Sequence, residues 1–97
     1  MRRLRWTLRA REDLANIRAY INEQSPNYAA LVMGRVITAT DRLAQFPESG
    51  RAVPEFEQPD VREVIYRPYR IVYPLVGADE AHVLTVHHSA RPFPDGL

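Results

Sequence analysis

Two helix boundaries marked by proline constrain the fold of this chain more than any other feature. A helix begins at Ser25-Pro26, because serine caps the free N–H groups of a first turn and proline fits its first position. Apolar residues at helical spacing precede this point and follow it. Phe46-Pro47 ends the second run, since proline disfavours helical geometry in the residue before it. The link between the helices is so short that we expect an antiparallel helical hairpin.

Each predicted helix has one apolar side. We expect the first helix to be capped by Thr7 or a neighbour, to end near Glu23, and to bury the stripe Ala10, Leu14, Ile17 and Ile21. The stripe of the second helix comprises Ala29, Met33, Val36, Thr40 and Leu43, widened by Ala30, Ile37 and Ala44. Such stripes are typical of helices that pack one face on a core.

Short apolar runs predict strands on both sides of the helices. Residues 4–8 alternate, and after a proline-rich loop at 47–60 we expect strands at 61–67, 69–76 and 81–88, with a turn at 77–80. Pro74 weakens its strand near the end, because proline cannot donate to a ladder. The order strand, helix, helix and three strands predicts one α+β domain, residues 1–97. In it the helical hairpin packs on one face of an antiparallel sheet in two layers.

The aromatic residues allow two interpretations. Trp6, Tyr66, Tyr69 and Tyr73 can form a stacking platform for nucleic-acid bases or part of the core. Tyr69, Ile71 and Tyr73 alternate along one predicted strand, which favours the core.

The composition excludes several classes of protein. The chain has no cysteine, so thiolate metal sites, thiol nucleophiles and disulfides are absent. No apolar run is long enough for a membrane span, and no apolar segment follows the basic start, so we expect a cytoplasmic protein without membrane partners. His82, His87 and His88 lie on one predicted strand with spacings unsuited to a shared metal. No nucleotide or metalloprotease motif is present, so we expect no metal and no cofactor.

The basic residues are unusual in kind and in distribution. All thirteen are arginine, and the formal net charge is only +1, which does not by itself predict nucleic-acid binding. Arginines crowd the first eleven residues, whereas acidic residues cluster around 55–63. The resulting dipolar surface can serve partner recognition, or it can be two solvated faces.

One constellation has catalytic potential. Alternation and hairpin pairing place Arg70 near His87 and His88, with Arg91 just beyond. Two guanidiniums and an imidazole can hold a phosphodiester and move a proton, which is the minimum for RNA cleavage through a ribose 2′-hydroxyl. The alternative is structural: Arg70 forms a salt bridge with Glu63, and the histidine is hydrogen-bonded to the backbone.

Motifs spread along the chain are together more specific than any one of them. They are Leu4-Arg5-Trp6-Thr7, Asp13-Leu14 with Ile17 and Tyr20-Ile21, Leu43 with Phe46-Pro47 and Gly50-Arg51, Val61-Arg62-Glu63, Pro68-Tyr69-Arg70-Ile71-Val72-Tyr73, and Val83-Leu84 with Val86, His88 and Arg91. In this string the chain resembles the RelE/ParE toxin superfamily over residues 4–92, in the form often called plasmid-stabilisation protein. The resemblance implies the same element order, a type II toxin, and a ParD-like antitoxin that wraps and neutralises it.

The two branches of this superfamily differ in their targets. ParE-like toxins act on DNA gyrase, whereas RelE-like toxins cut mRNA in the ribosomal A site. RelE-type enzymes use basic residues on a strand, two further arginines and a C-terminal acid–base residue. Arg70 and Arg91 match the two arginines, but Glu63 and Ile65 stand where the basic residues belong, and no tyrosine follows Arg91. On the RelE interpretation, His88 would replace the acid–base residue, as histidine does in some relatives.

These departures favour the ParE branch, a gyrase inhibitor without catalysis of its own. The alternative is a ribosome-dependent mRNA endonuclease with Arg70, His88 and Arg91 as catalytic residues. A third hypothesis is an interaction module that only binds its antitoxin. We expect an amphipathic antitoxin segment to cover the apolar surface between helical hairpin and sheet. Its acidic residues are expected to pair with Arg3, Arg5 and Arg9.

Overall fold

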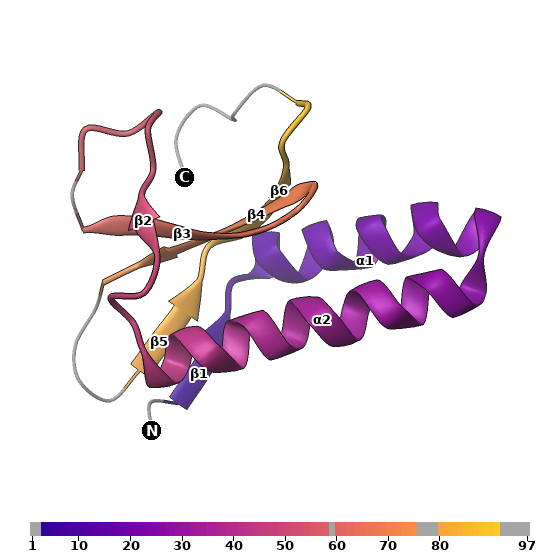
Figure 1. Ribbon diagram of the computed structural model, residues 1–97, viewed down its shortest axis with the longest axis horizontal. Coiled ribbons are helices and arrows are strands. Elements are labelled where there is room, and N and C mark those ends of the chain that lie inside the picture. Colours follow the sequence, from indigo (N-terminus) through magenta and orange to yellow (C-terminus); the bar gives the residue numbers. More distant parts are fainter. Residues whose placement is uncertain (1–2, 59, 76–79, 92–97) are drawn as a thin grey trace.

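A computed structural model describes residues 3–58, 60–75 and 80–91. Two long helices lie beside a group of short strands (Figure 1). In chain order the elements are β1 (Arg3–Trp6), α1 (Leu8–Gln24), α2 (Pro26–Gln45), β2 (Arg51–Ala52), β3 (Val61–Tyr66), β4 (Tyr69–Pro74), β5 (Glu80–Val83) and β6 (Thr85–His88). The α+β class and the predicted element order are confirmed, with β2 as an added strand in the expected loop and the last predicted strand divided in two.

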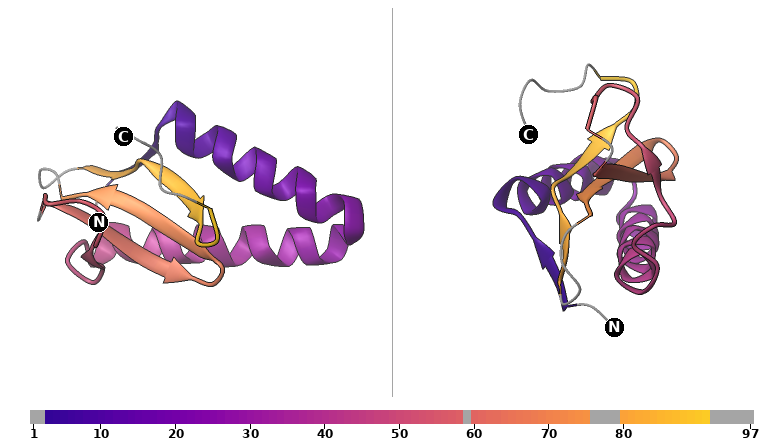
Figure 2. Two further views of the ribbon diagram at one scale, coloured as in Figure 1. Left: turned by 90° about the horizontal axis from the view of Figure 1, so that it is seen from above. Right: turned by 90° about the vertical axis from the view of Figure 1, so that its left-hand side faces the viewer.

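The helical hairpin has the predicted caps. The Thr7 hydroxyl accepts a hydrogen bond from the Ala10 N–H at 3.0 Å, and the Ser25 hydroxyl accepts one from the Tyr28 N–H at 3.2 Å. Pro26 occupies the first turn of α2, which ends one residue before Phe46. The two helices run side by side in opposite directions (Figure 2). Local capping chemistry therefore sets both the turn and the length of the hairpin.

The strands depart from the prediction of one antiparallel sheet. Four strands form an antiparallel sheet in the order β2-β3-β4-β6, but β1 pairs with β5 in parallel. The predicted strand at 81–88 is broken at Leu84, whose N–H donates to the Val72 carbonyl at 2.8 Å and whose carbonyl accepts from the Thr7 hydroxyl. This break lets β5 meet β1 while β6 meets β4. Of the predicted turn at 77–80, residues 77–79 lie outside the described residues.

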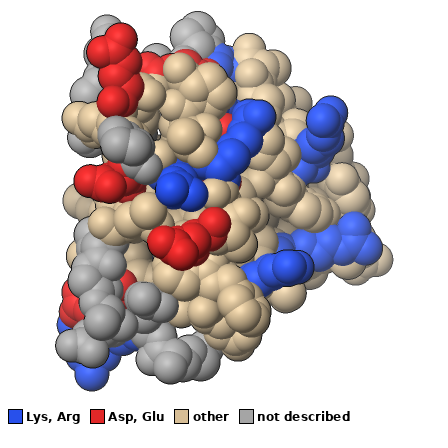
Figure 3. Space-filling model, turned by 60° about the vertical axis from the view of Figure 1, so that its left-hand side comes forward, with Lys and Arg blue, Asp and Glu red and all other residues tan. Residues whose placement is uncertain are grey.

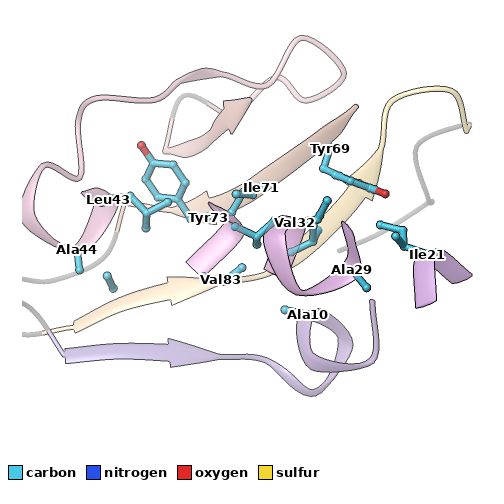
Figure 4. Packing of buried hydrophobic residues seen from close by; sticks show 13 residues of the cluster. Ala10, Ile21, Ala29, Val32, Leu43, Ala44, Tyr69, Ile71, Tyr73 and Val83 are labelled. Carbon is cyan, nitrogen blue, oxygen red and sulfur yellow. The ribbon is translucent and has the colours of Figure 1, made fainter. Parts of the chain in front are cut away.

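The core lies between the helices and the strands, and most of the predicted stripes contribute to it. Figure 4 shows Val32 and Leu43 of α2 facing Tyr69, Ile71 and Tyr73 of β4. The core interpretation of the aromatic residues is confirmed, because Tyr69 and Tyr73 are buried, and Trp6 and Tyr66 are partly buried and pack against the core cluster.

Three residues expected on the apolar sides lie outside the core. Ile37 is 48% exposed and Ala30 is exposed, whereas Val32 is buried, so the apolar face of α2 is rotated from the predicted one. Leu8 belongs to α1 instead of the first strand and is 65% exposed.

A buried tyrosine hydroxyl anchors the segment after α2 to the sheet. The Tyr73 hydroxyl donates to the Pro47 carbonyl at 2.7 Å and accepts from the Gly50 N–H at 2.9 Å. An Arg62 N–H donates to the Gly50 carbonyl at 3.1 Å. Burial raises the pKa of the Tyr73 hydroxyl, which therefore stays protonated and able to donate. The chain passes so close to β3 and β4 here that only glycine fits.

Replacing Gly50 tests this close approach. A Cβ at position 50 would lie 2.6 Å from the Glu63 carbonyl oxygen and 2.9 Å from the Tyr73 ring. We expect Gly50→Ala to lower the free energy of unfolding by about 1–3 kcal/mol, measured by urea denaturation. Gly34→Ala is the matched control, because a Cβ there meets nothing within 4 Å on an exposed part of α2. It should stabilise the protein by about 1 kcal/mol. Equal effects of the two changes would contradict the proposed anchor.

Candidate functional site

Arg70 lies at the centre of an ion-pair network on the sheet. Its Nε is 2.6 Å from Glu63 Oε1, and its two terminal nitrogens are each 2.6 Å from an oxygen of Glu55. Arg51 approaches the other oxygen of Glu63 at 2.8 Å. The Glu63 side chain is fully buried and that of Arg70 is 11% exposed. The predicted salt bridge between Arg70 and Glu63 is confirmed.

The hydrogen bonds between Arg70 and its carboxylate partners shift pKa values so that the charged forms are favoured. Hydrogen bonding to Arg70 lowers the pKa of Glu55 from 4.5 to about 2, although burial opposes the shift. Hydrogen bonds with Glu55 and then Glu63 raise the pKa of Arg70. A bidentate carboxylate matches the guanidinium fork and takes the donors that a phosphate would otherwise use. An incoming anion must therefore displace Glu55, which is the more exposed of the two partners.

His88 and Arg91 lie in a different pocket from Arg70. A pocket of about 500 Å³ between α1 and β6 includes His88, Arg91, Arg9 and Tyr20 in its lining. Arg70 lines another pocket, together with Arg51, Glu55, Arg67 and Ser89. The expected register is correct, since Arg70 lies opposite His87 across the β4–β6 ladder. The structure thus brings His88 and Arg91 together but does not bring Arg70 into their pocket.

Both histidines of this region contact the backbone. His88 Nδ1 accepts a hydrogen bond from the Ala90 N–H at 3.1 Å, and its ring meets the Tyr69 ring edge to face at 5.5 Å. His87 Nε2 is 2.9 Å from the Arg91 carbonyl oxygen. The lone pair of His88 Nδ1 is therefore engaged, and the proton of its neutral ring lies on Nε2. In this arrangement His88 is a hydrogen-bond donor instead of a base.

The three arginines expected to contact an antitoxin fall into two groups. Arg3 and Arg5 lie on β1, while Arg9 lies on α1 and lines the pocket with His88. Arg5 is 2.9 Å from Glu80, which also meets His82 at 2.9 Å. Hydrogen bonds from His82 and then Arg5 lower the pKa of Glu80. On the face drawn in Figure 3, basic and acidic side chains lie close together in the middle, while further basic ones lie along one side.

Sequence reasoning missed a cluster of tyrosines. A pocket of about 260 Å³ between the helical hairpin and the β3–β4 turn includes Tyr20, Tyr28, Tyr66 and Tyr69 in its lining. Tyr20 is 64% exposed and Tyr28 is 54% exposed. The only signal in the sequence was that Tyr20 lies off the apolar stripe of its helix, where an aromatic residue gains little from the core.

Within the part of the chain that the structure describes, no group of three or more histidine, cysteine, aspartate or glutamate residues could hold a metal ion. No helix of the described ranges is long and apolar enough to cross a membrane.

Comparison with known proteins identifies the family. The model of the ParE toxin of the type II toxin-antitoxin system parDE matches residues 4–93. The chain belongs to the ParE toxin family. The expected resemblance to the RelE/ParE superfamily is thereby confirmed, and the protein is a type II toxin of that superfamily.

Curated relatives and solved structures agree with this assignment. The chain is 39% identical to the putative toxin Y4kP of Sinorhizobium fredii, over 99% of this chain and 97% of that protein. It is 36% identical to toxin RelE2 of Caulobacter vibrioides, over 89% and 93%. The fold is similar to a chain of the chromosomal ParDE system from P. aeruginosa, with a TM-score of 0.72, 26% identity and coverage of 91% and 96%. A chain of the RelBE2 complex from Mycobacterium tuberculosis shares the fold at a TM-score of 0.59, 23% identity and coverage of 93% and 93%.

Glu55 should make the stability of this ParE-family protein depend on pH. Its pKa is lower in the folded state, so it stabilises the fold above its usual pKa of 4.5, and this contribution is lost as the pH falls toward about 2. The carboxylate is 40% exposed, so we expect about 1 kcal/mol at neutral pH after solvent screening.

The variant Glu55→Gln should therefore unfold more easily than the wild type at pH 7 and equally at about pH 2. Denaturant titrations at both pH values measure this difference. Glu57→Gln, on the same loop and without an ion pair to any described residue, is the control and should change little. A stability loss in Glu55→Gln that is the same at both pH values would show that the ion pair does not cause it.

Proposed function

We propose that this ParE-family toxin inhibits DNA gyrase without catalysis of its own and is neutralised by a cognate antitoxin. One observation carries the proposal: all three nitrogens of the Arg70 guanidinium donate hydrogen bonds to carboxylates, those of Glu55 and Glu63. A toxin that cleaves RNA needs cations available to the phosphate backbone. Inhibition of gyrase by binding makes no such demand on Arg70, and it requires the toxin to act in the cytoplasm.

The surroundings of Arg70 support this choice. Glu63 and Ile65 occupy the positions where RelE-type enzymes have basic residues, and Glu63 is buried beneath Arg70. An RNA phosphate near Arg70 would meet carboxylates where a nuclease offers cations. His88, the substitute acid–base residue, lies in another pocket with one nitrogen occupied by a backbone N–H.

An endonuclease of the RelE type is the second candidate. It is favoured by the 36% identity with toxin RelE2 and by the pocket that holds His88 and Arg91 together. On this alternative, His88 would have to release the Ala90 N–H from its Nδ1 to move a proton, and Arg91 would bind the phosphate. Arg70 would have to exchange Glu55 for RNA.

The antitoxin is proposed to cover the tyrosine pocket between the helical hairpin and the sheet. The relatives solved as ParDE and RelBE2 systems support an antitoxin partner. Exposed rings such as Tyr20 and Tyr28 give large contact area at low cost in conformational entropy, which suits an amphipathic segment. Arg3 offers a guanidinium to its acidic residues along β1, Arg5 does so by exchanging its partner Glu80, and Arg9 lies farther away on α1.

Two assays with purified toxin separate the candidate targets. Gyrase acting on relaxed plasmid should lose supercoiling activity as toxin is added, and linear DNA should accumulate after detergent and protease treatment. Messenger RNA on translating ribosomes should remain intact at the same toxin concentrations. Active gyrase together with cut mRNA would transfer the assignment to the RelE-type alternative. Failure of both assays would favour a module that only binds its antitoxin.

Charge reversal tests the antitoxin contact on β1. We expect Arg3→Glu with Arg5→Glu to weaken binding of the antitoxin encoded beside the toxin gene at least tenfold at low salt. Titration calorimetry at two salt concentrations measures the effect, which should shrink as salt screens the charges. Arg18→Glu on α1 is a control at an exposed arginine outside these sites. Unchanged affinity at low salt would remove β1 from the interface.

A further inference from the structure

The outer side of α2 carries apolar residues where a surface helix normally carries charged ones. Leu31 is 46% exposed and Ile37 is 48% exposed, and each lies about 120° around the helix from the buried Leu43. Gly34 lies between them, directly opposite Leu43, and a Cβ there would meet nothing within 4 Å. Figure 2 shows α2 at the border of the molecule. This side of the helix is therefore open to a partner.

The polar groups on and beside this side are engaged elsewhere. The Thr38 hydroxyl donates to the Gly34 carbonyl at 2.9 Å, so the methyl group of Thr38 is free for an apolar contact. Arg35, at the margin of this side, extends to the Tyr66 hydroxyl at 3.4 Å. The strip from Ala30 to Thr38 therefore presents no charge at its centre. Such a strip favours an apolar partner over a highly charged one.

The spacing of large and small residues fits a second copy of the same helix that runs in the opposite direction. A two-fold axis beside Gly34 places Leu31 against Thr38 of the second copy. The same axis places Ile37 against Ala30 of the second copy. Each large side chain thus lies over a small one, and symmetry repeats both contacts. Gly34 lets the two helix axes approach to about 8 Å, the short end of the range for packed helices.

Charge distinguishes the antiparallel arrangement from a parallel one. Asp41 lies on the same side of α2 and forms no ion pair with any described residue. In an antiparallel pair it lies opposite Asn27 of the second copy, in a first helical turn that contains no acidic residue. A carboxylate is stabilised at this positive end of a helix. In a parallel pair the two Asp41 carboxylates would face each other and repel.

We propose that the outer side of α2 is a self-association surface through which two copies of this toxin form an antiparallel, two-fold symmetric dimer. The helix has 20 residues and is about 30 Å long. One pair of such helices covers less than the roughly 800 Å² per partner of a standard interface, so we expect a dissociation constant of about 10–100 µM. The surface is separate from the tyrosine pocket, to which α2 contributes Tyr28 and Val32, and it does not depend on the target of the toxin.

Association of the free toxin tests the surface. Analytical ultracentrifugation below and above about 100 µM should show a shift from monomer to dimer. Ile37→Asp places a charge in the apolar contact, and Gly34→Leu keeps the helices apart, so each should raise the dissociation constant about tenfold or more. Ile65→Asp is the matched control and should associate like the wild type, because Ile65 is 43% exposed on β3, outside this surface. Denaturation midpoints confirm that each variant is folded.

Cysteine cross-linking tests the arrangement of the two helices, and the natural chain has no cysteine to interfere. Gly34→Cys should form a disulfide-linked dimer under mild oxidation, because the two-fold axis brings this residue of both copies together. Asn27→Cys and Asp41→Cys should cross-link when the two variants are mixed, and neither should do so alone.

Four results would each overturn the proposal. They are a toxin that stays monomeric at every concentration, a dimer that Ile37→Asp leaves unchanged, cross-linking of Asn27→Cys with itself, and a monomeric toxin whose binding of the antitoxin is weakened by Ile37→Asp. The last result would assign this side of α2 to the antitoxin.

Discussion

The buried carboxylate of Glu63 is the constraint on which this face of the sheet depends. A fully buried charge is tolerated only when it is paired, and here Arg51 of β2 and Arg70 of β4 pair with it from either side. Arg70 in turn holds Glu55, so the loop after β2 is closed onto the sheet. The Tyr73 hydroxyl secures the preceding segment at Pro47 and Gly50. Five hydrogen-bonded side chains thus hold the segment from Pro47 to Glu55 on the sheet.

This network divides the arginines of the protein by role. Arg51 and Arg70 are paired within the fold, whereas Arg9 and Arg91 form no ion pair among the described residues. The residues that match a nuclease in the sequence are therefore not equivalent in space. Arg70 belongs to an ion pair network that supports structure, and Arg91 belongs to a pocket that is open to a ligand.

The helices were predictable because their boundaries depend on neighbouring residues. The strand pairing and the ion pairs were harder to predict, because they depend on residues that are distant in the chain. Thr7, Ser25 and Pro26 act on their own neighbours, so caps and boundaries followed directly from the sequence. The break at Leu84 could not be foreseen, because it depends on Val72 and Thr7, which are distant in the chain. The salt bridge between Arg70 and Glu63 was one of two interpretations that the sequence left open. The role of Glu55 and the pocket that Arg9 and Arg91 share were missed, because both come from loop and helix placement in three dimensions.

The central claim is that Arg70 serves folding and not chemistry, and a paired replacement tests it most directly. Arg70→Met alone leaves Glu63 buried with less compensation, at a cost of about 3 kcal/mol or more. Glu63→Leu with Arg70→Met removes both charges and should recover most of this loss, while Glu55 and Arg51 remain hydrated at the surface. The measurement is inhibition of gyrase supercoiling by the folded double variant. The account predicts inhibition close to that of the wild type, and a stable double variant that leaves gyrase fully active would contradict it.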